Sequence, residues 1–242
     1  MNIKLNISYD GTNFSGWQIQ PNQRTVQNEL QNAIQNIFKN RHLKLKGAGR
    51  TDSGVHANGQ VANFCINTSM KESQIKDAIN SVIPKDIYIN SCNFENIDFD
   101  SRFSAKSRQY VYKINNKYDP FKRNYYWHMN YQIDVKKINK CADIILGNHD
   151  FQLFCKSISK QENNKCIVTQ SNWKVEQDNY YYVISSNRFL HHMVRMLVGT
   201  MIEVGKGRLS ISHFEKMIDV NTEKKRIVTS PSQGLYLNKV NY

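Results

Sequence analysis

The chain has 242 residues, of which 40% are hydrophobic, and its formal net charge is +13. This length allows one large domain or two modest ones with a substantial core, and the hydrophobic content argues against wholesale disorder. The positive charge favours a polyanionic partner, and nucleic acid is preferred over an anionic membrane surface.

Five widely spaced cysteines without a Cys-x-x-Cys pair predict reduced thiols. The first residues alternate apolar and polar side chains and so do not form a signal region, and no later apolar run is long enough to span a bilayer. We therefore expect a cytoplasmic protein that is neither secreted nor inserted in a membrane.

In the first part of the chain, alternating side chains predict a strand over residues 3–9 that stops at the turn formed by Asp10 and Gly11. Thr25 is expected to cap a helix whose apolar face covers 26–38. Further along, the pattern predicts apolar stretches at 43–48 and 61–66 around a glycine-rich loop, a helix over 75–82, and a strand from 87.

The second part has the same interleaved pattern. It predicts a strand over 110–114, a helix over 135–146, a hairpin around 173–183, a long apolar helix over 189–205, a short helix over 211–218 and a terminal strand over 235–240. This order favours an α+β fold with mainly antiparallel pairing over a doubly wound parallel sheet. The least regular join lies between 92 and 108, so the expected domains are 1–104 and 105–242.

Basic residues recur all along the chain. The groups are Lys44, Lys46 and Arg50, then Arg102, Lys106 and Arg108, then Lys122 and Arg123, and finally Lys224, Lys225 and Arg226. A positive field of this kind suits nucleic acid, although a coding bias towards lysine would also produce it.

Residues 47–57, GAGRTDSGVHA, concentrate turn formers and reactive side chains. Glycine lets the backbone approach a ligand closely, while Arg50, Asp52 and His56 supply polar groups. Functional and structural interpretations both stand here, because Asp-Ser-Gly is ordinary turn chemistry and Arg50 could simply pair with Asp52.

His56, and the pair formed by the consecutive residues His191 and His192, raise the question of a metal site. Neighbouring histidines within the predicted helix would point to different sides of it, and no cysteine or acidic residue has suitable spacing. The sequence therefore predicts no metal.

Five motifs follow one another along the chain. They are YDGTNFSGWQIQP at 9–21 with TVQ at 25–27, GRTDSGVHA at 49–57, FSAKSRQYVY at 103–112, FLHHMVRMLVGT at 189–200, and GLYL at 234–237 with the ending at 242. Together they resemble the TruA-type tRNA pseudouridine synthase family. The chain departs from the family at Ser53, where alanine is common, and at 230–232, where Ser-Pro-Ser replaces a more apolar proline segment.

The resemblance implies the pseudouridine synthase fold, in which two similar α+β halves with mainly antiparallel sheets join around a central basic cleft. It also implies that Asp52 is the catalytic aspartate, acting without cofactor or metal. A carboxylate can attack the anomeric carbon of ribose, or it can remove a C2′ proton to give a glycal, and the sequence leaves both routes open.

Four other residues match supporting positions of the family. Arg195 is the expected cation that keeps a dry carboxylate charged, although it could instead extend from the helix edge to solvent. Tyr110 is expected to stack on the target uracil, with a purely structural strand tyrosine as the alternative. Arg50 is expected to contact RNA phosphate or to insert near the stack when uridine flips out, and Leu235 to line the pocket floor.

The implied substrate is tRNA, modified at adjacent uridines on the 3′ side of the anticodon arm by a homodimer. Two alternatives stay open. One is a catalytically inactive tRNA-binding or RNA chaperone protein on the same scaffold, which the presence of Asp52, Tyr110 and Arg195 disfavours. The other is a related synthase that acts on a different RNA.

Overall fold

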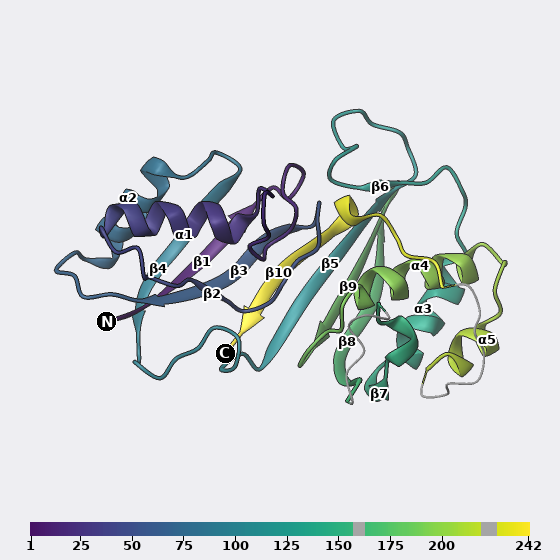
Figure 1. The fold of residues 1–242 in the computed structure, drawn as a ribbon. Coiled ribbons are helices and arrows are strands. Elements are labelled where there is room, and N and C mark those ends of the chain that lie inside the picture. The colour runs from purple at the N-terminus through teal and green to yellow at the C-terminus, as the bar shows by residue number, and fades with distance from the viewer. Residues whose placement is uncertain (157–162, 219–226) are drawn as a thin grey trace. The chain divides into compact units, whose positions relative to one another are not determined.

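The computed structural model describes residues 1–156, 163–218 and 227–242, so the basic run Lys224, Lys225 and Arg226 lies outside the described residues. The chain forms two compact units (Figure 1). The first contains Met1–Lys106 together with Tyr236–Tyr242, and the second contains Ser107–Leu235.

The first unit is a sheet with the strand order β4-β1-β3-β10. Its strands are β1 (Asn2–Tyr9), β3 (His56–Cys65), β4 (Ile87–Glu95), β10 (Leu235–Asn241) and the short β2 (Lys46–Gly47), which pairs with β3. β1 is antiparallel to both neighbours, whereas β10 is parallel to β3. Helices α1 (Val26–Ile37) and α2 (Glu72–Val82) cover one face (Figure 1).

β1 is one of the two interior strands of this sheet, and one of its faces is buried. Ile3, Leu5 and Ile7 alternate along it and are completely buried. On α1 the predicted helical stripe is also buried, and Leu30 and Ile34 are completely inaccessible to solvent.

Thr25 occupies the predicted N-cap position of α1, but the expected capping hydrogen bond is absent. Its hydroxyl is buried without a partner among the described residues. Two amides of the first turn are bonded elsewhere, because Val26 N donates to Gly16 O (3.2 Å) and Gln27 N, which a side-chain cap could serve, donates to Trp17 O (3.0 Å). The backbone of the preceding segment therefore replaces the side-chain cap.

The second unit has the strand order β5-β9-β8-β7. Its strands are β5 (Ser107–Asn115), β6 (Trp127–His128), β7 (Gly147–Asp150), β8 (Lys165–Glu176) and β9 (Asn179–Ser186), and its helices are α3 (Val135–Ile144), α4 (Met193–Gly205), α5 (Ile211–Lys216) and the short η1 (Gln152–Phe154) and η3 (Ser232–Gly234). β8 and β9 form the predicted hairpin. The predicted α+β fold with mainly antiparallel pairing is confirmed.

The long apolar helix begins at Met193 and not at the predicted Phe189. His192 interrupts it, because its backbone lies in the left-handed region with φ 66°. His191 and His192 therefore precede α4, and the expectation that helix geometry turns them to different sides is wrong.

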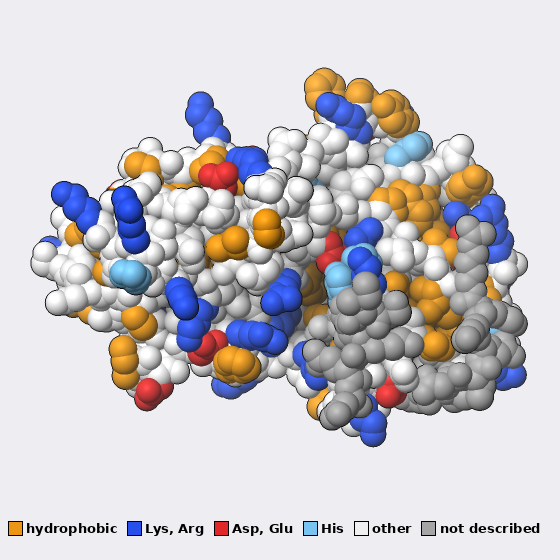
Figure 2. Space-filling model, viewed as in Figure 1, with side chains coloured by type: hydrophobic (Ala, Val, Ile, Leu, Met, Phe, Trp, Pro, Cys, Tyr) orange, Lys and Arg blue, Asp and Glu red, His pale blue; other side chains and the backbone are white. Residues whose placement is uncertain are grey.

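The surface of each unit carries many Lys and Arg side chains, as Figure 2 shows for one face. In the part of the chain that the structure describes, no helix combines the length and the apolar character needed to cross a bilayer.

Candidate active site

Asp52 lies on the loop between β2 and β3 and is half-buried. Val55 N donates to Asp52 O (3.1 Å) and closes the turn that carries the aspartate. Gln60, buried on β3, donates its side-chain amide to Gly49 O (2.9 Å) at the start of the loop. The loop is thus bonded internally and to the sheet beneath it.

The N-terminal motif holds the other side of this loop. Trp17 N donates to Thr51 O (3.1 Å), and Gly54 N donates to Phe14 O (3.2 Å). Gly16 has φ +93°, and a Cβ atom there would lie 2.5 Å from Thr51 O. Because only glycine suits both this backbone conformation and this approach, two motifs that are distant in sequence form one frame.

A buried hydroxyl pair supports the loop from below. The hydroxyl oxygens of Tyr9 and Thr51 lie 2.8 Å apart, and Thr51 directly precedes Asp52 in the chain. Burial raises the pKa of Tyr9, so its phenol stays neutral at physiological pH. Tyr9 therefore acts here as a fixed hydrogen-bonding group and not as a base.

His56 proves to be part of the frame around the loop. It is 2% exposed, its Nδ1 accepts from Gly11 N (3.0 Å), and the same nitrogen lies 3.2 Å from Asp10 Oδ1. Its ring stacks on Tyr236 of β10, with centroids 4.6 Å apart. These contacts fix the imidazole ring between the turn after β1 and strand β10.

Arg50 lies on the same loop but is exposed, and its Nε donates to Gln18 Oε1 (3.1 Å). Ser53, which differs from the family pattern, donates its hydroxyl to Phe14 O (3.2 Å) and so adds a bond to the frame. Asp52 and Arg50 thus come from the first unit, while the other predicted site residues come from the second.

Arg195 is half-buried on α4, where two hydrogen bonds tie it to the segment before η3. Its Nε donates to Ser230 O (2.9 Å), and Ser230 N donates back to Arg195 O (3.0 Å). The contact is close because of Gly199, where a Cβ atom would lie 2.1 Å from Val228 O. These backbone contacts fix the stem of the arginine.

Tyr110 and Tyr112 lie two residues apart on β5, and both are buried. Tyr110 makes an edge-to-face contact with Phe189, with centroids 5.1 Å apart. Tyr112 donates its hydroxyl to Pro231 O (2.6 Å). Burial raises the pKa of Tyr112, and the charge of Arg195 partly offsets this effect.

Sequence reasoning missed Tyr112 as a site-supporting residue, although its period-two spacing from Tyr110 was visible. Its ring also requires Gly234, where a Cβ atom would lie 2.7 Å from the ring. The next residue, Leu235, is 5% exposed. Tyr112 therefore organises the segment that ends at this leucine.

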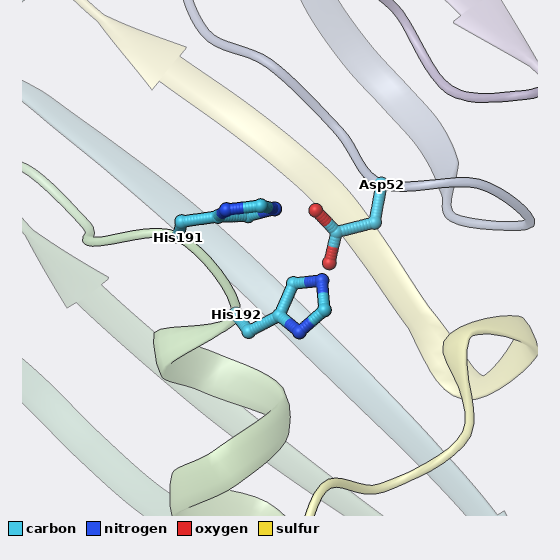
Figure 3. Close-up of side chains that lie close together, drawn as sticks. All are labelled: Asp52, His191 and His192. Atoms are coloured by element: carbon cyan, nitrogen blue, oxygen red, sulfur yellow. The ribbon is translucent and has the colours of Figure 1, made fainter. Parts of the chain in front are cut away.

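Figure 3 labels three side chains: Asp52 on the β2–β3 loop of the first unit, and His191 and His192 at the start of α4 in the second. The two histidine rings meet edge-on with centroids 4.3 Å apart. The left-handed backbone of His192 is uncommon for a residue other than glycine and makes it a candidate for function. The sequence did not indicate this backbone conformation, because the apolar pattern predicted a helix that included His192.

Comparisons with known proteins agree on one family. The pattern of the tRNA pseudouridine synthase family matches residues 6–104 and 142–242, which include Asp52, Arg195 and Leu235 but not Tyr110. The chain is 37% identical over 242 residues to tRNA pseudouridine synthase A of Halalkalibacterium halodurans, covering 99% of this chain and 92% of that protein. It is 40% identical over 238 residues to the protein of the same name from Thermosipho melanesiensis, covering 98% and 97%. The names of these relatives do not support the alternative of a catalytically inactive tRNA-binding or RNA chaperone protein.

Proposed function

The chain belongs to the tRNA pseudouridine synthase family, and on that premise we propose that it isomerises uridine to pseudouridine in tRNA with Asp52 as the catalytic carboxylate. The observation that carries the proposal is the frame around Asp52. The glycine-dependent approach of Gly16 to Thr51 and the buried Tyr9 fix the loop from two sides. A reacting group needs this kind of fixed geometry.

The reaction exchanges one bond of the ribose for another. The bond between N1 of uracil and C1′ breaks, the base turns, and a bond forms between C5 and C1′, after which C5 loses its proton and N1 carries one. Asp52 either attacks C1′ and forms a transient ester, or removes the C2′ proton to give a glycal. Either route requires Asp52 in its charged form.

The other proposed site residues stabilise the charged form of Asp52 or bind the uracil and the RNA. Arg195 supplies the cation that keeps Asp52 ionised when RNA excludes water, and its bond to Ser230 O holds the stem of the guanidinium. Tyr110, fixed by its contact with Phe189, stacks on the uracil. Arg50 contacts RNA phosphate or enters the space that the flipped uridine leaves, and Leu235 lines the floor of the pocket.

The substrate uridines are adjacent ones on the 3′ side of the tRNA anticodon arm, and the enzyme works as a homodimer in the cytoplasm. A net charge of +13 supports recognition through phosphate contacts and shape, which tolerates different flanking bases.

The test is a pseudouridine map of unmodified tRNA incubated with the purified protein. We expect new pseudouridine only in the anticodon arm, and Asp52→Asn should lower the rate by at least about 10⁴-fold because no carboxylate remains. Asp77→Asn is the matched control, since Asp77 is 74% exposed on α2 and should keep full activity. Modification confined to another RNA region, or an active Asp52→Asn protein, would contradict the proposal.

A further inference from the structure

The segment between β5 and the start of α3 contains an exposed aromatic surface that the proposed reaction does not use. We call residues 116–131 the aromatic loop. Its exposed rings are Phe121 (86%), Tyr118 (63%), Tyr131 (50%) and Tyr125 (38%). Figure 2 shows hydrophobic side chains together with a basic one on the loop that lies beside β6 in Figure 1.

Local hydrogen bonds order this loop even though its rings face solvent. The Asp119 carboxylate accepts from Phe121 N (2.9 Å), and Asp119 O accepts from Lys122 N (3.0 Å). Lys122 O in turn accepts from Tyr125 N (2.9 Å) and Tyr126 N (3.0 Å). Rings on consecutive bonded turns lose less entropy on binding than rings on an unstructured loop.

Cations lie over two rings of the aromatic loop, the half-buried Tyr126 and the exposed Tyr131. The ammonium groups of Lys113 and Lys122 both lie 5.7 Å from the centroid of Tyr126. Around Tyr131, Lys206 lies at 4.5 Å and Arg208 at 5.9 Å. Such alternation of exposed rings and cations is typical of surfaces that bind single-stranded nucleic acid, where bases stack on rings and cations meet phosphates.

We infer that the aromatic loop binds unpaired nucleotides of the RNA substrate, with Tyr118 and Phe121 as stacking platforms and Lys122 and Arg123 as phosphate contacts. The inference rests on the proposed function and extends it, because it adds a binding surface for RNA outside the residues assigned to the reaction. Paired RNA would not suit this surface, since its bases are already stacked on one another.

A second copy of the chain is the other occupant to consider, and charge disfavours it. The aromatic loop contains three basic residues and one acidic residue. Lysine is depleted at the centres of protein interfaces, and one acidic residue cannot offset three basic ones within the loop. A polyanion, by contrast, gains from every one of these cations.

The test compares the affinity of the full-length protein for unmodified tRNA, for a single-stranded oligoribonucleotide and for a blunt RNA duplex. We expect Tyr118→Ala and Phe121→Ala each to weaken binding of the first two by about tenfold, with little effect on the duplex. Tyr88→Ala is the matched control, because Tyr88 is a 54% exposed tyrosine on β4.

Salt dependence separates the two kinds of contact. The ring variants should leave the slope of log affinity against log salt unchanged, whereas Lys122→Gln and Arg123→Gln should each reduce it by about 1. Unchanged affinity in both ring variants overturns the inference, as does a loss of self-association in ultracentrifugation without a loss of RNA binding. Pseudouridine formation by these variants, measured against Asp52→Asn, shows separately whether the proposed function holds.

Discussion

The position of Asp52 is decided by residues that take no part in the chemistry. Gly16 adopts φ +93° and brings its Cα against Thr51 O, while Trp17 N donates to the same oxygen (3.1 Å). Because one carbonyl receives both contacts, a methyl group added at Gly16 must displace Thr51, the residue that precedes the proposed catalytic carboxylate.

Gly16→Ala tests this coupling. The new methyl group would meet Thr51 O at 2.5 Å, so we expect a loss of about 1–3 kcal/mol in stability from backbone strain and at least a tenfold fall in kcat through displacement of Asp52. Gly49→Ala, on the same loop, meets nothing within 4 Å and should change stability by less than about 0.5 kcal/mol. Urea unfolding and single-turnover kinetics measure the two effects. Equal kcat values for the two variants would refute the coupling.

At the scale of elements, the hydrophobic period identified helices and strands more reliably than the end signals did. α1 and β1 follow their predicted stripes. The ends depend on neighbours instead, since α1 is capped by the carbonyls of Gly16 and Trp17. β6 and β7 were not predicted, because two and four residues are too few to display a period.

Thr25→Val distinguishes a backbone cap from a side-chain cap. A side-chain cap would make this change cost about 0.5–2 kcal/mol. Here the hydroxyl is buried without a partner among the described residues, so we expect the free energy of unfolding to stay constant or rise by about 1 kcal/mol. Asp134→Ala at α3 is the contrasting variant, because Asp134 accepts from Lys137 N (3.1 Å) and its loss should cost about 1 kcal/mol. Thermal unfolding compares them, and a clear loss in Thr25→Val would contradict our account.

At the scale of the whole molecule, residues 236–242 belong to the same unit as residues 1–106. β10 lies parallel to β3, with Leu237 opposite Ala57, and Lys106 N donates to Asn241 O (2.8 Å). The first unit is therefore completed by residues 236–242, which follow the whole of the second unit in the sequence, and its sheet depends on this distant strand.

Leu237→Ala should expose this dependence. Leu237 is completely buried, so its truncation should cost about 2–5 kcal/mol and weaken hydrogen-exchange protection in β1 and β3 more than in β8. The exposed Lys239 on the same strand provides the control, Lys239→Ala, with protection unchanged. Stronger loss of protection in β8 than in β3 would show that the strand supports the other unit instead.

The sequence by itself determined the fold class, the family and the order of most elements, because hydrophobic periods and motifs are local properties that survive without coordinates. It also supplied Asp52, Arg195 and Tyr110 as candidates, whose roles stay proposals. Tertiary structure alone decided how Gly16 meets Thr51, how His56 is held against the turn after β1, why α4 begins after a left-handed His192, and where β10 pairs. These features depend on contacts between residues far apart in the chain, and no local pattern encodes which distant backbone will satisfy a given amide or exclude a given methyl group.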